Sequence, residues 1–151
     1  MLLTDYLKPD CIKTGFAAAD KRTALELLCR FIEEKHNLDF SEVLRVVRER
    51  EALGSTGVGG GVALPHGKSA QAKKTALIMA ISPAGVDFDS LDGRPTHVFV
   101  LMVTPKNGEG SEHLSILARL GAMFKAAGTV ENLSKASSSE EVFAYLSARG
   151  Q

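Results

Sequence analysis

One histidine stands in a setting that could expose an imidazole for chemistry. His66 lies between Pro65, which fixes the backbone before it, and Gly67, which we expect to leave room for a bulky group. A neutral imidazole with a pKa near ~6.5 is a nucleophile and can attack a phosphorus atom without a separate base. The setting is suited to an exposed nucleophile for phosphoryl transfer, but spacing alone does not prefer this interpretation over a satisfied structural histidine in a turn.

A transferred phosphoryl group also needs N–H donors or cations around its oxygens. Ser111 is expected to be the N-cap of a helix with His113 in its first turn. Unpaired N–H groups and a hydroxyl at such a helix start form an anion-binding site. Arg50 is a permanent cation sixteen residues before His66, near the end of another predicted helix. The sequence permits these groups to meet around His66 without showing that they do.

The glycine-rich segment before His66 does not match a nucleotide-binding loop. Both standard phosphate-binding patterns require glycine at position 62, where Val62 stands. Pro65 also has no N–H to point at a phosphate. The sequence therefore predicts no nucleotide and no other cofactor.

A metal hydrolase built on His66 and His113 is the least favoured alternative. Such a site needs a carboxylate at suitable spacing, and only Glu112 and the acidic turn 87–92 offer one. These acids are better explained as turn formers, so no metal site is predicted.

The first element expected to position these residues is an amphipathic helix over residues 20–36. Thr23 and Glu26 have capping-box spacing, and His36 belongs to a basic last turn, where we expect it at the surface. Apolar residues recur every three or four positions, at Leu25, Leu28, Cys29 and Ile32.

A second helix is expected to begin near Asp39 or Ser41 and to end at Gly54. Its inward residues are Val43, Leu44 and Val47. A short strand over residues 61–64 then ends at Pro65, which pushes the preceding residue towards an extended conformation.

Two apolar runs, residues 75–81 and 97–103, are nearly continuous rather than alternating. This pattern is typical of strands covered on both faces, so we expect them at the centre of a sheet. Residues 83–95 are rich in turn formers and must connect the two strands. His97, which opens the second run, is interpreted as structural.

Two further helices are expected after the strands. The one capped by Ser111 should bury a stripe of Leu114, Leu117, Ala118, Gly121 and Phe124. The last begins at Ser138 and should bury Val142, Phe143 and Leu146. Helices around buried strands predict an α/β fold, a three-layer sandwich, with residues 1–151 as one domain.

Composition limits the kinds of partner the protein can bind and its expected location in the cell. Lys plus Arg and Asp plus Glu each number 18, so the basic excess that nucleic-acid binding requires is absent. No apolar run reaches the ~18 residues of a membrane span, and the N-terminus lacks a secretory pattern, so we expect a soluble, cytoplasmic protein without membrane insertion. Cys11 and Cys29 are interpreted as small core residues.

Residues 50–67 closely resemble the active-site segment of type-2 enzyme IIA domains of the bacterial phosphotransferase system, the mannitol, fructose and nitrogen-regulatory family. Residues 88–95 and 112–114 also resemble that family in order and spacing, so the likeness spans nearly the whole chain. It implies a mixed sheet flanked by helices in the mannitol-type enzyme IIA fold.

The resemblance also implies roles for individual residues. His66 would take a phosphoryl group from a phosphohistidine on an HPr-type carrier (HPr or NPr), and His113 would help to hold the phosphate. Arg50 would contact the phosphoryl group or the partner. From the residues themselves, Ser111 and Gly67 are expected beside the phosphate, and small apolar groups, namely Val58, Leu64 and Gly67, are expected to be exposed around it.

Two departures from the family pattern concern loops. Residues 59–61 are richer in glycine than expected, and loop 106–111 is lengthened or loosened by its two glycines. Neither change removes a chemical group, so both bear on loop mobility and partner fit.

Two biological roles compete within this resemblance. The lone domain and the motifs in 53–57 and 91–95 favour a nitrogen-regulatory protein that binds targets such as a potassium transporter or a sensor kinase. The alternative is a fructose- or mannitol-type transport subunit that passes the group to a permease IIB domain. A non-catalytic docking module is a third class, and loss of His66 would be its mark.

Overall fold

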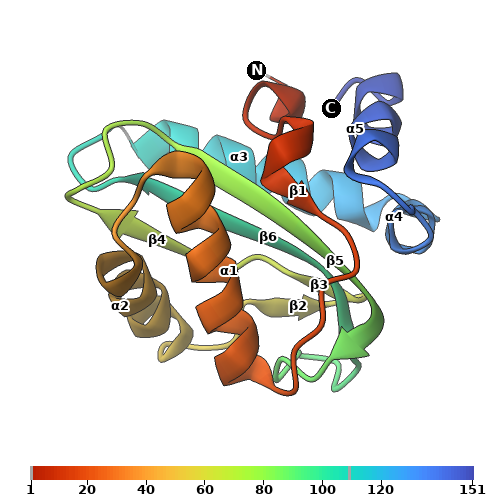
Figure 1. Cartoon of the computed structure of the whole chain (residues 1–151), viewed down its shortest axis with the longest axis horizontal. Coiled ribbons are helices and arrows are strands. Elements are labelled where there is room, and N and C mark those ends of the chain that lie inside the picture. The colour runs from red at the N-terminus through yellow and green to blue at the C-terminus, as the bar shows by residue number, and fades with distance from the viewer. Residues whose placement is uncertain (1, 109) are drawn as a thin grey trace.

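The computed structural model describes residues 2–108 and 110–151. Their centre is a mixed six-stranded sheet in the order β1–β5–β6–β3–β2, with β4 also paired to β6 (Figure 1). β5 is antiparallel to β6, whereas β1 joins β5, and β3 and β4 join β6, in parallel. The strands are β1 Ile12–Lys13, β2 Gly57–Gly59, β3 Val62–Ala63, β4 His66–Ser69, β5 Ala76–Val86 and β6 Thr96–Pro105.

Helices cover both faces of the sheet, which confirms the predicted three-layer α/β sandwich (Figure 1). One core cluster joins α1 and α2 to one face, and a second joins α3, α4 and α5 to the other. The helices are α1 Lys21–His36, α2 Phe40–Glu51, α3 Gly110–Lys125, α4 Thr129–Ser134 and α5 Ser139–Ala148, with two 3-10 turns at Leu3–Asp5 and Pro9–Cys11.

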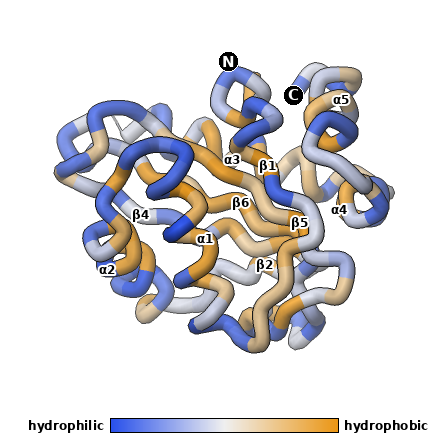
Figure 2. The backbone as a smooth tube through the Cα atoms, in the orientation of Figure 1, coloured by the Kyte–Doolittle hydropathy of each residue, from blue (hydrophilic) through white to orange (hydrophobic). Residues whose placement is uncertain are grey.

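The central strands β5 and β6 are buried on both faces, as their continuous apolar runs predict. Ile78 and Leu101 belong to the cluster under α1 and α2, and their neighbours Met79 and Val100 belong to the cluster under α3. This alternation is the period of two that a strand imposes. Figure 2 shows the apolar residues concentrated along these strands.

β3 and β4 form one strand that is interrupted at Leu64 and Pro65. Val62 pairs with Val98 of β6 and His66 pairs with Met102, so the parallel register continues unbroken across the interruption. The sequence predicts the first half of this strand and ends it at Pro65. The second half is not predicted, and His66 opens it with its own partner in β6.

The predicted helix ends are close to the observed ones, with corrected caps. Asp20 caps α1 by accepting from the Thr23 N–H at 2.8 Å, so Thr23 is the donor and not the capping residue that its spacing with Glu26 suggests. Asp39 caps α2, which ends at Glu51 rather than at Gly54. Ser138 caps α5 as expected, although Phe143 is only half-buried.

The predicted apolar stripe of α3 is only partly correct, because Leu117 and Phe124 pack against the core but are not its fully buried residues. The buried residues are His113, Ile116, Leu120 and Met123. Leu114 is 67% exposed, because the leucines of this helix are shared between the core face and the surface. The helix begins at Gly110, so Ser111 lies inside its first turn and not at its N-cap; Glu109 lies outside the described residues. The short helix α4 is not predicted at all.

Two histidines have structural roles. His97 donates from Nδ1 to the Ser82 carbonyl at 2.9 Å, which confirms its interpretation. His36 is half-buried rather than a surface residue, because its Nε2 lies 2.9 Å from the Leu77 carbonyl and 3.6 Å from Cys11 Sγ. Cys11 and Cys29 are buried, as expected of core residues.

Among the described residues, no helix is long and apolar enough to cross a membrane. The cytoplasmic location stays a prediction.

Candidate active site

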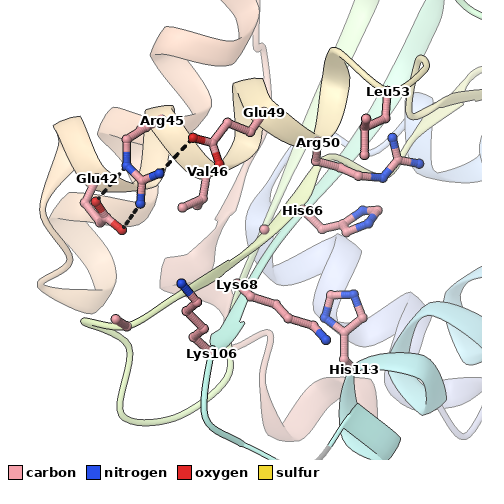
Figure 3. Close-up of a pocket in the computed structure, with 12 residues that line it drawn as sticks. Glu42, Arg45, Val46, Glu49, Arg50, Leu53, His66, Lys68, Lys106 and His113 are labelled. Carbon is pink, nitrogen blue, oxygen red and sulfur yellow. Dashed lines mark hydrogen bonds and ion pairs between the residues drawn. The ribbon is translucent and has the colours of Figure 1, made fainter.

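A cavity of about 390 Å³ opens at the edge of the sheet along β4, between α2 and α3 (Figure 3). Arg50 and Leu53 line it from the end of α2, His66 and Lys68 from β4, and His113 from α3. The structure therefore brings together the three residues that the sequence proposes for transfer. Ser111, which is exposed, is not among the lining residues.

His66 is held so that one ring nitrogen remains available. Its Nδ1 donates to the Leu64 carbonyl at 2.8 Å, on the strand interruption that Pro65 enforces. Since a carbonyl only accepts, the proton is on Nδ1 and Nε2 carries the lone pair. Burial and the nearby Arg50 charge lower the pKa of His66, against an opposing effect of the Leu64 carbonyl, so the ring is neutral near pH 7.

His113 lies across the cavity from His66. The two ring centroids are 5.2 Å apart, with the planes inclined by 67°. The His113 ring is 8% exposed, and its Nδ1 is 2.9 Å from the Thr104 hydroxyl. Burial, then the neighbouring His66 and Lys68, lower the pKa of His113 to about 4. It can therefore act near pH 7 as a neutral hydrogen-bonding group, not as a cation.

Cations surround the two histidines. Arg50 Nη1 donates to the Gly54 carbonyl at 2.9 Å, and Figure 3 shows Arg50 on one side of His66 with His113 on the other. Lys68 and Lys106 also line the cavity. Within residues 2–108 and 110–151, no ion pair involves Arg50, Lys68 or Lys106. An anion placed between the two histidines would meet the positive charges of Arg50, which acts on His66, and of Lys68, which acts on His113.

Not every cation on the cavity wall is available to an anion. Arg45 is paired with Glu42 at 2.7 Å and with Glu49 at 2.8 Å on the surface of α2. The hydrogen bonds from Arg45 lower the pKa of Glu42, so this cluster stays ionised at neutral pH. With two carboxylates and one guanidinium, the cluster carries a net charge of −1 and adds no positive potential to the cavity.

Gly67 has a different role from the one its position suggests. A Cβ at Gly67 would lie 2.7 Å from Val46 Cγ2 and 3.2 Å from the Val46 carbonyl carbon. Because side chains alternate along β4, Gly67 faces α2, on the sheet face opposite to His66. The expectation that Gly67 leaves room for a bulky group is wrong, since the glycine instead lets α2 approach β4. Contact between the Gly67 backbone and a phosphate stays a prediction.

The apolar groups exposed near His66 also differ from expectation. Leu64 and Gly67 are buried, and of the three expected residues only Val58 is exposed, at 51%. Leu53, at 84%, and Leu114, at 67%, are more exposed still. Leu53 lines the cavity and presents apolar surface there, whereas Leu114 follows His113 on α3 and is not among the lining residues.

A buried carboxylate holds the turn that carries Leu53. The Glu51 side chain, 6% exposed, is 2.8 Å from Lys21 Nζ and accepts hydrogen bonds from the Thr56 N–H and hydroxyl. This cluster connects the start of α1 to the turn that supplies the Gly54 carbonyl to Arg50. Its partners lie far apart in the sequence, so no local pattern indicates it.

Among residues 2–108 and 110–151, no group of three or more His, Cys, Asp or Glu side chains could hold a metal ion. The metal-hydrolase alternative gains no support from this geometry.

Residues 5–149 match the family described as "Phosphoenolpyruvate-dependent sugar phosphotransferase system, EIIA 2". The chain belongs to this family. The fold can therefore be described as that of an EIIA domain.

Three proteins are similar to this EIIA chain over nearly its whole length. A nitrogen regulatory protein of Bradyrhizobium diazoefficiens is 31% identical over 146 residues, which cover 97% of this chain and 95% of that protein. The crystal structure of the nitrogen regulatory protein IIA-Ntr from Neisseria meningitidis is 32% identical with a TM-score of 0.88, and the match covers 95% of this chain and 98% of that one. The fructose-specific EIIABC component of Bacillus subtilis is 29% identical over 94% of this chain but only 22% of its own length.

Sequence reasoning missed two residues of the EIIA cavity, Lys68 and Lys106. The signal for Lys68 was present, because it stands two positions after His66 and a strand places such residues on one face. It was missed because residues 66–69 are not predicted as a strand. Lys106 follows the end of β6, and only the pairing of β6 with β4 brings it to the site.

Proposed function

We propose that the whole chain acts as one EIIA phosphoryl carrier that accepts a phosphoryl group on Nε2 of His66 from a phosphohistidine of an HPr-type carrier. One observation supports it above the others. The Nδ1–H of His66 is bound to the Leu64 carbonyl, and the ring lines a cavity together with Arg50, Lys68 and Lys106. A nucleophile with a fixed tautomer beside uncompensated cations meets the main needs of phosphoryl transfer.

The transfer needs no proton to leave the acceptor. The Nε2 lone pair of His66 forms the new N–P bond, while the P–N bond of the donor breaks and returns its electron pair to the donor imidazole. His66 then carries a positive ring that keeps its Nδ1 proton. The Leu64 carbonyl, 2.8 Å away, stabilises that charge by accepting the same hydrogen bond throughout.

The oxygens of the transferred group are the second requirement. Arg50 has a planar fork of donors suited to two of them, and His113 faces His66 as a neutral partner. Lys68 and Lys106 supply further positive charge. Contact with the Ser111 hydroxyl, which is exposed on the first turn of α3, stays a prediction.

Within this function, the nitrogen-regulatory role is favoured over sugar transport. Two of the similar proteins are named nitrogen regulatory proteins and match over nearly their whole lengths. Phosphorylation would add about −1.5 to −2 charges at pH 7 beside the exposed Leu53 and Leu114. A target that docks on this apolar surface with an acidic face would then be rejected in the phosphorylated state.

The carrier function is tested by incubating the chain with labelled phosphoenolpyruvate, enzyme I and each candidate HPr-type carrier. One label should appear, lost in mild acid and kept in alkali, as expected of a phosphoramidate. His66→Ala should take up none, whereas the matched variant His97→Ala should be labelled like wild type. An acid-stable label, or full labelling of His66→Ala, would contradict the proposal.

The regulatory role has a separate test. Binding of a potassium-transport protein or a sensor kinase should differ between the unphosphorylated and phosphorylated chain, and His66→Ala should bind like the unphosphorylated form. Equal affinity in all three, together with rapid transfer to a fructose-type IIB domain, would favour the transport role instead.

A further inference from the structure

One contact of the cavity wall involves a residue without an assigned role. Thr104 of β6 is 4% exposed, and its Oγ1 lies 2.9 Å from Nδ1 of His113. Strand pairing places Lys68 opposite Thr104 and His66 opposite Met102. Thr104 therefore lies on the same sheet face as His66, two positions further along, and the ladder fixes its position relative to the nucleophile.

We propose that Thr104 is a positioning residue whose hydroxyl donates to Nδ1 of His113 and so keeps the His113 proton on Nε2, where it can bind a phosphoryl oxygen. This inference rests on the proposed carrier function.

The first step of the argument is the chemistry of the two ligands. Phosphoryl oxygens only accept hydrogen bonds, so a neutral imidazole can hold one only through an N–H. His113 is neutral near pH 7, because burial, His66 and Lys68 lower its pKa to about 4. It therefore has one proton, and that proton is on Nε2 when the Thr104 hydroxyl donates to Nδ1.

The second step is the choice of partner at each Nδ1. His66 faces the Leu64 carbonyl, which only accepts and so fixes the proton on Nδ1. His113 faces a hydroxyl, which can donate and so permits the opposite tautomer. The two histidines of the site are thus suited to opposite tasks: His66 presents a lone pair, and His113 presents an N–H.

The third step concerns Glu112, the carboxylate nearest to His113 in sequence. A carboxylate on Nδ1 would pull the proton there and leave a lone pair on Nε2, which would repel a phosphoryl oxygen. Glu112 is instead bound by the Thr75 hydroxyl, and it raises the pKa of Tyr6 after the larger effect of burial. Within the described part of the chain, Thr104 is the hydrogen-bond partner of the His113 ring.

The test compares Thr104→Val, which keeps the shape without the hydroxyl, with Thr104→Ser, which keeps the hydroxyl. Thr96→Val is a matched control, because Thr96 is a buried threonine of the same strand whose hydroxyl has no partner among the described residues. Histidine tautomers are read from ¹⁵N NMR of the phosphorylated chain, and phosphoryl transfer from the HPr-type carrier is timed in parallel.

In the phosphorylated wild type, His113 should carry its proton on Nε2. Thr104→Val should shift the proton towards Nδ1 and slow transfer by about 10-fold, as loss of a residue that orients another binding group does. Thr104→Ser should restore both the tautomer and the rate, and Thr96→Val should change neither. A purely packing role for Thr104 would leave the tautomer unchanged in every variant.

The inference is overturned if phosphorylated wild type has His113 protonated on Nδ1, a result that does not depend on any variant folding. It is also overturned if Thr104→Val keeps the wild-type tautomer and rate. If His66 takes up no phosphoryl group even in wild type, the carrier function itself fails, and that outcome is distinguishable from both.

Discussion

His66 and His97 are held alike and differ in what surrounds the other ring nitrogen. Each donates from Nδ1 to a main-chain carbonyl, His66 to Leu64 at 2.8 Å and His97 to Ser82 at 2.9 Å. A Cβ added to Gly85 would lie 2.9 Å from His97 Cε1 and 3.3 Å from its Nε2, so the backbone covers that side of the ring. His66 instead lines a cavity of about 390 Å³ with Arg50.

The difference shows that a fixed tautomer alone does not make a nucleophile. Both rings have the lone pair on Nε2, but only His66 combines open space at that nitrogen with cations that can hold a phosphoryl group. Near Gly85, the equivalent hydrogen bond from His97 to the Ser82 carbonyl joins β6 to β5. The following changes should separate these two uses of histidine.

The largest effect is expected from Arg50→Ala. This variant removes a cation from the His66 cavity, and it should slow phosphoryl transfer by about 100-fold while leaving some phosphorylation at His66. Arg48→Ala is the matched control, since Arg48 of α2 pairs with Glu26 of α1 and does not line the cavity. Rates are measured by rapid-quench labelling. Equal rates for wild type and Arg50→Ala would exclude the proposed role.

A pair of glycine variants tests the two regions directly. Gly67→Ala forces a Cβ against Val46, and Gly85→Ala forces one against Pro95 and His97 at a φ of +81°, so each should lower the free energy of unfolding by about 1–3 kcal/mol. Only Gly67→Ala should also slow transfer in the folded protein, because it displaces α2 and Arg50. Urea unfolding and transfer rates check this, and slowed transfer in Gly85→Ala alone would reverse the assignment.

The buried His113 should make stability depend on pH. Its pKa falls from about 6.5 in the unfolded chain to about 4, so the folded state binds fewer protons. Its contribution is complete above about pH 6.5 and is lost as the pH falls towards 4, about 2 kcal/mol by pH 4.5. Urea unfolding at pH 7 and pH 4.5 should show a smaller loss for His113→Asn than for wild type. An equal loss in both would contradict the assigned pKa.

The smallest effect is expected at the apolar surface. Leu53→Ser should raise KM for the HPr-type carrier by about 5-fold with kcat unchanged, because Leu53 is 84% exposed beside the cavity and touches no reacting group. Leu91→Ser is the control, being 75% exposed in the connection between β5 and β6. A lower kcat with unchanged KM would place Leu53 in the chemistry instead of in docking.

The layers and the central strands could be predicted because local patterns determine them. Residues 75–81 and 97–103 are nearly continuous apolar runs; β5 contains 76–81, and β6 contains 97–103. The caps Asp39 and Ser138 were readable for the same reason, since a cap acts over three residues. The exact face of α3 could not be predicted, because Leu114 resembles a core residue but is exposed, whereas the polar His113 is buried against Thr104 and the sheet.

The residues of the site could be predicted from the sequence, but the contacts that hold them in place could not. His66, Arg50 and His113 were identified from residue type and family resemblance, and the cavity contains all three. Lys106 and the Glu51–Lys21 pair depend on contacts between distant segments, which no spacing reveals. Gly67 was assigned the wrong purpose, because the closeness of Val46 appears only once α2 is packed on β4.

The most direct test of the account is to identify the phosphorylated nitrogen by ³¹P–¹⁵N NMR of the chain after transfer from its carrier. The account predicts a phosphorus bonded to Nε2 of His66, with the Nδ1 proton still bound to the Leu64 carbonyl. Phosphorus on Nδ1 of His66, or on the ring of His97 or His113, would contradict it.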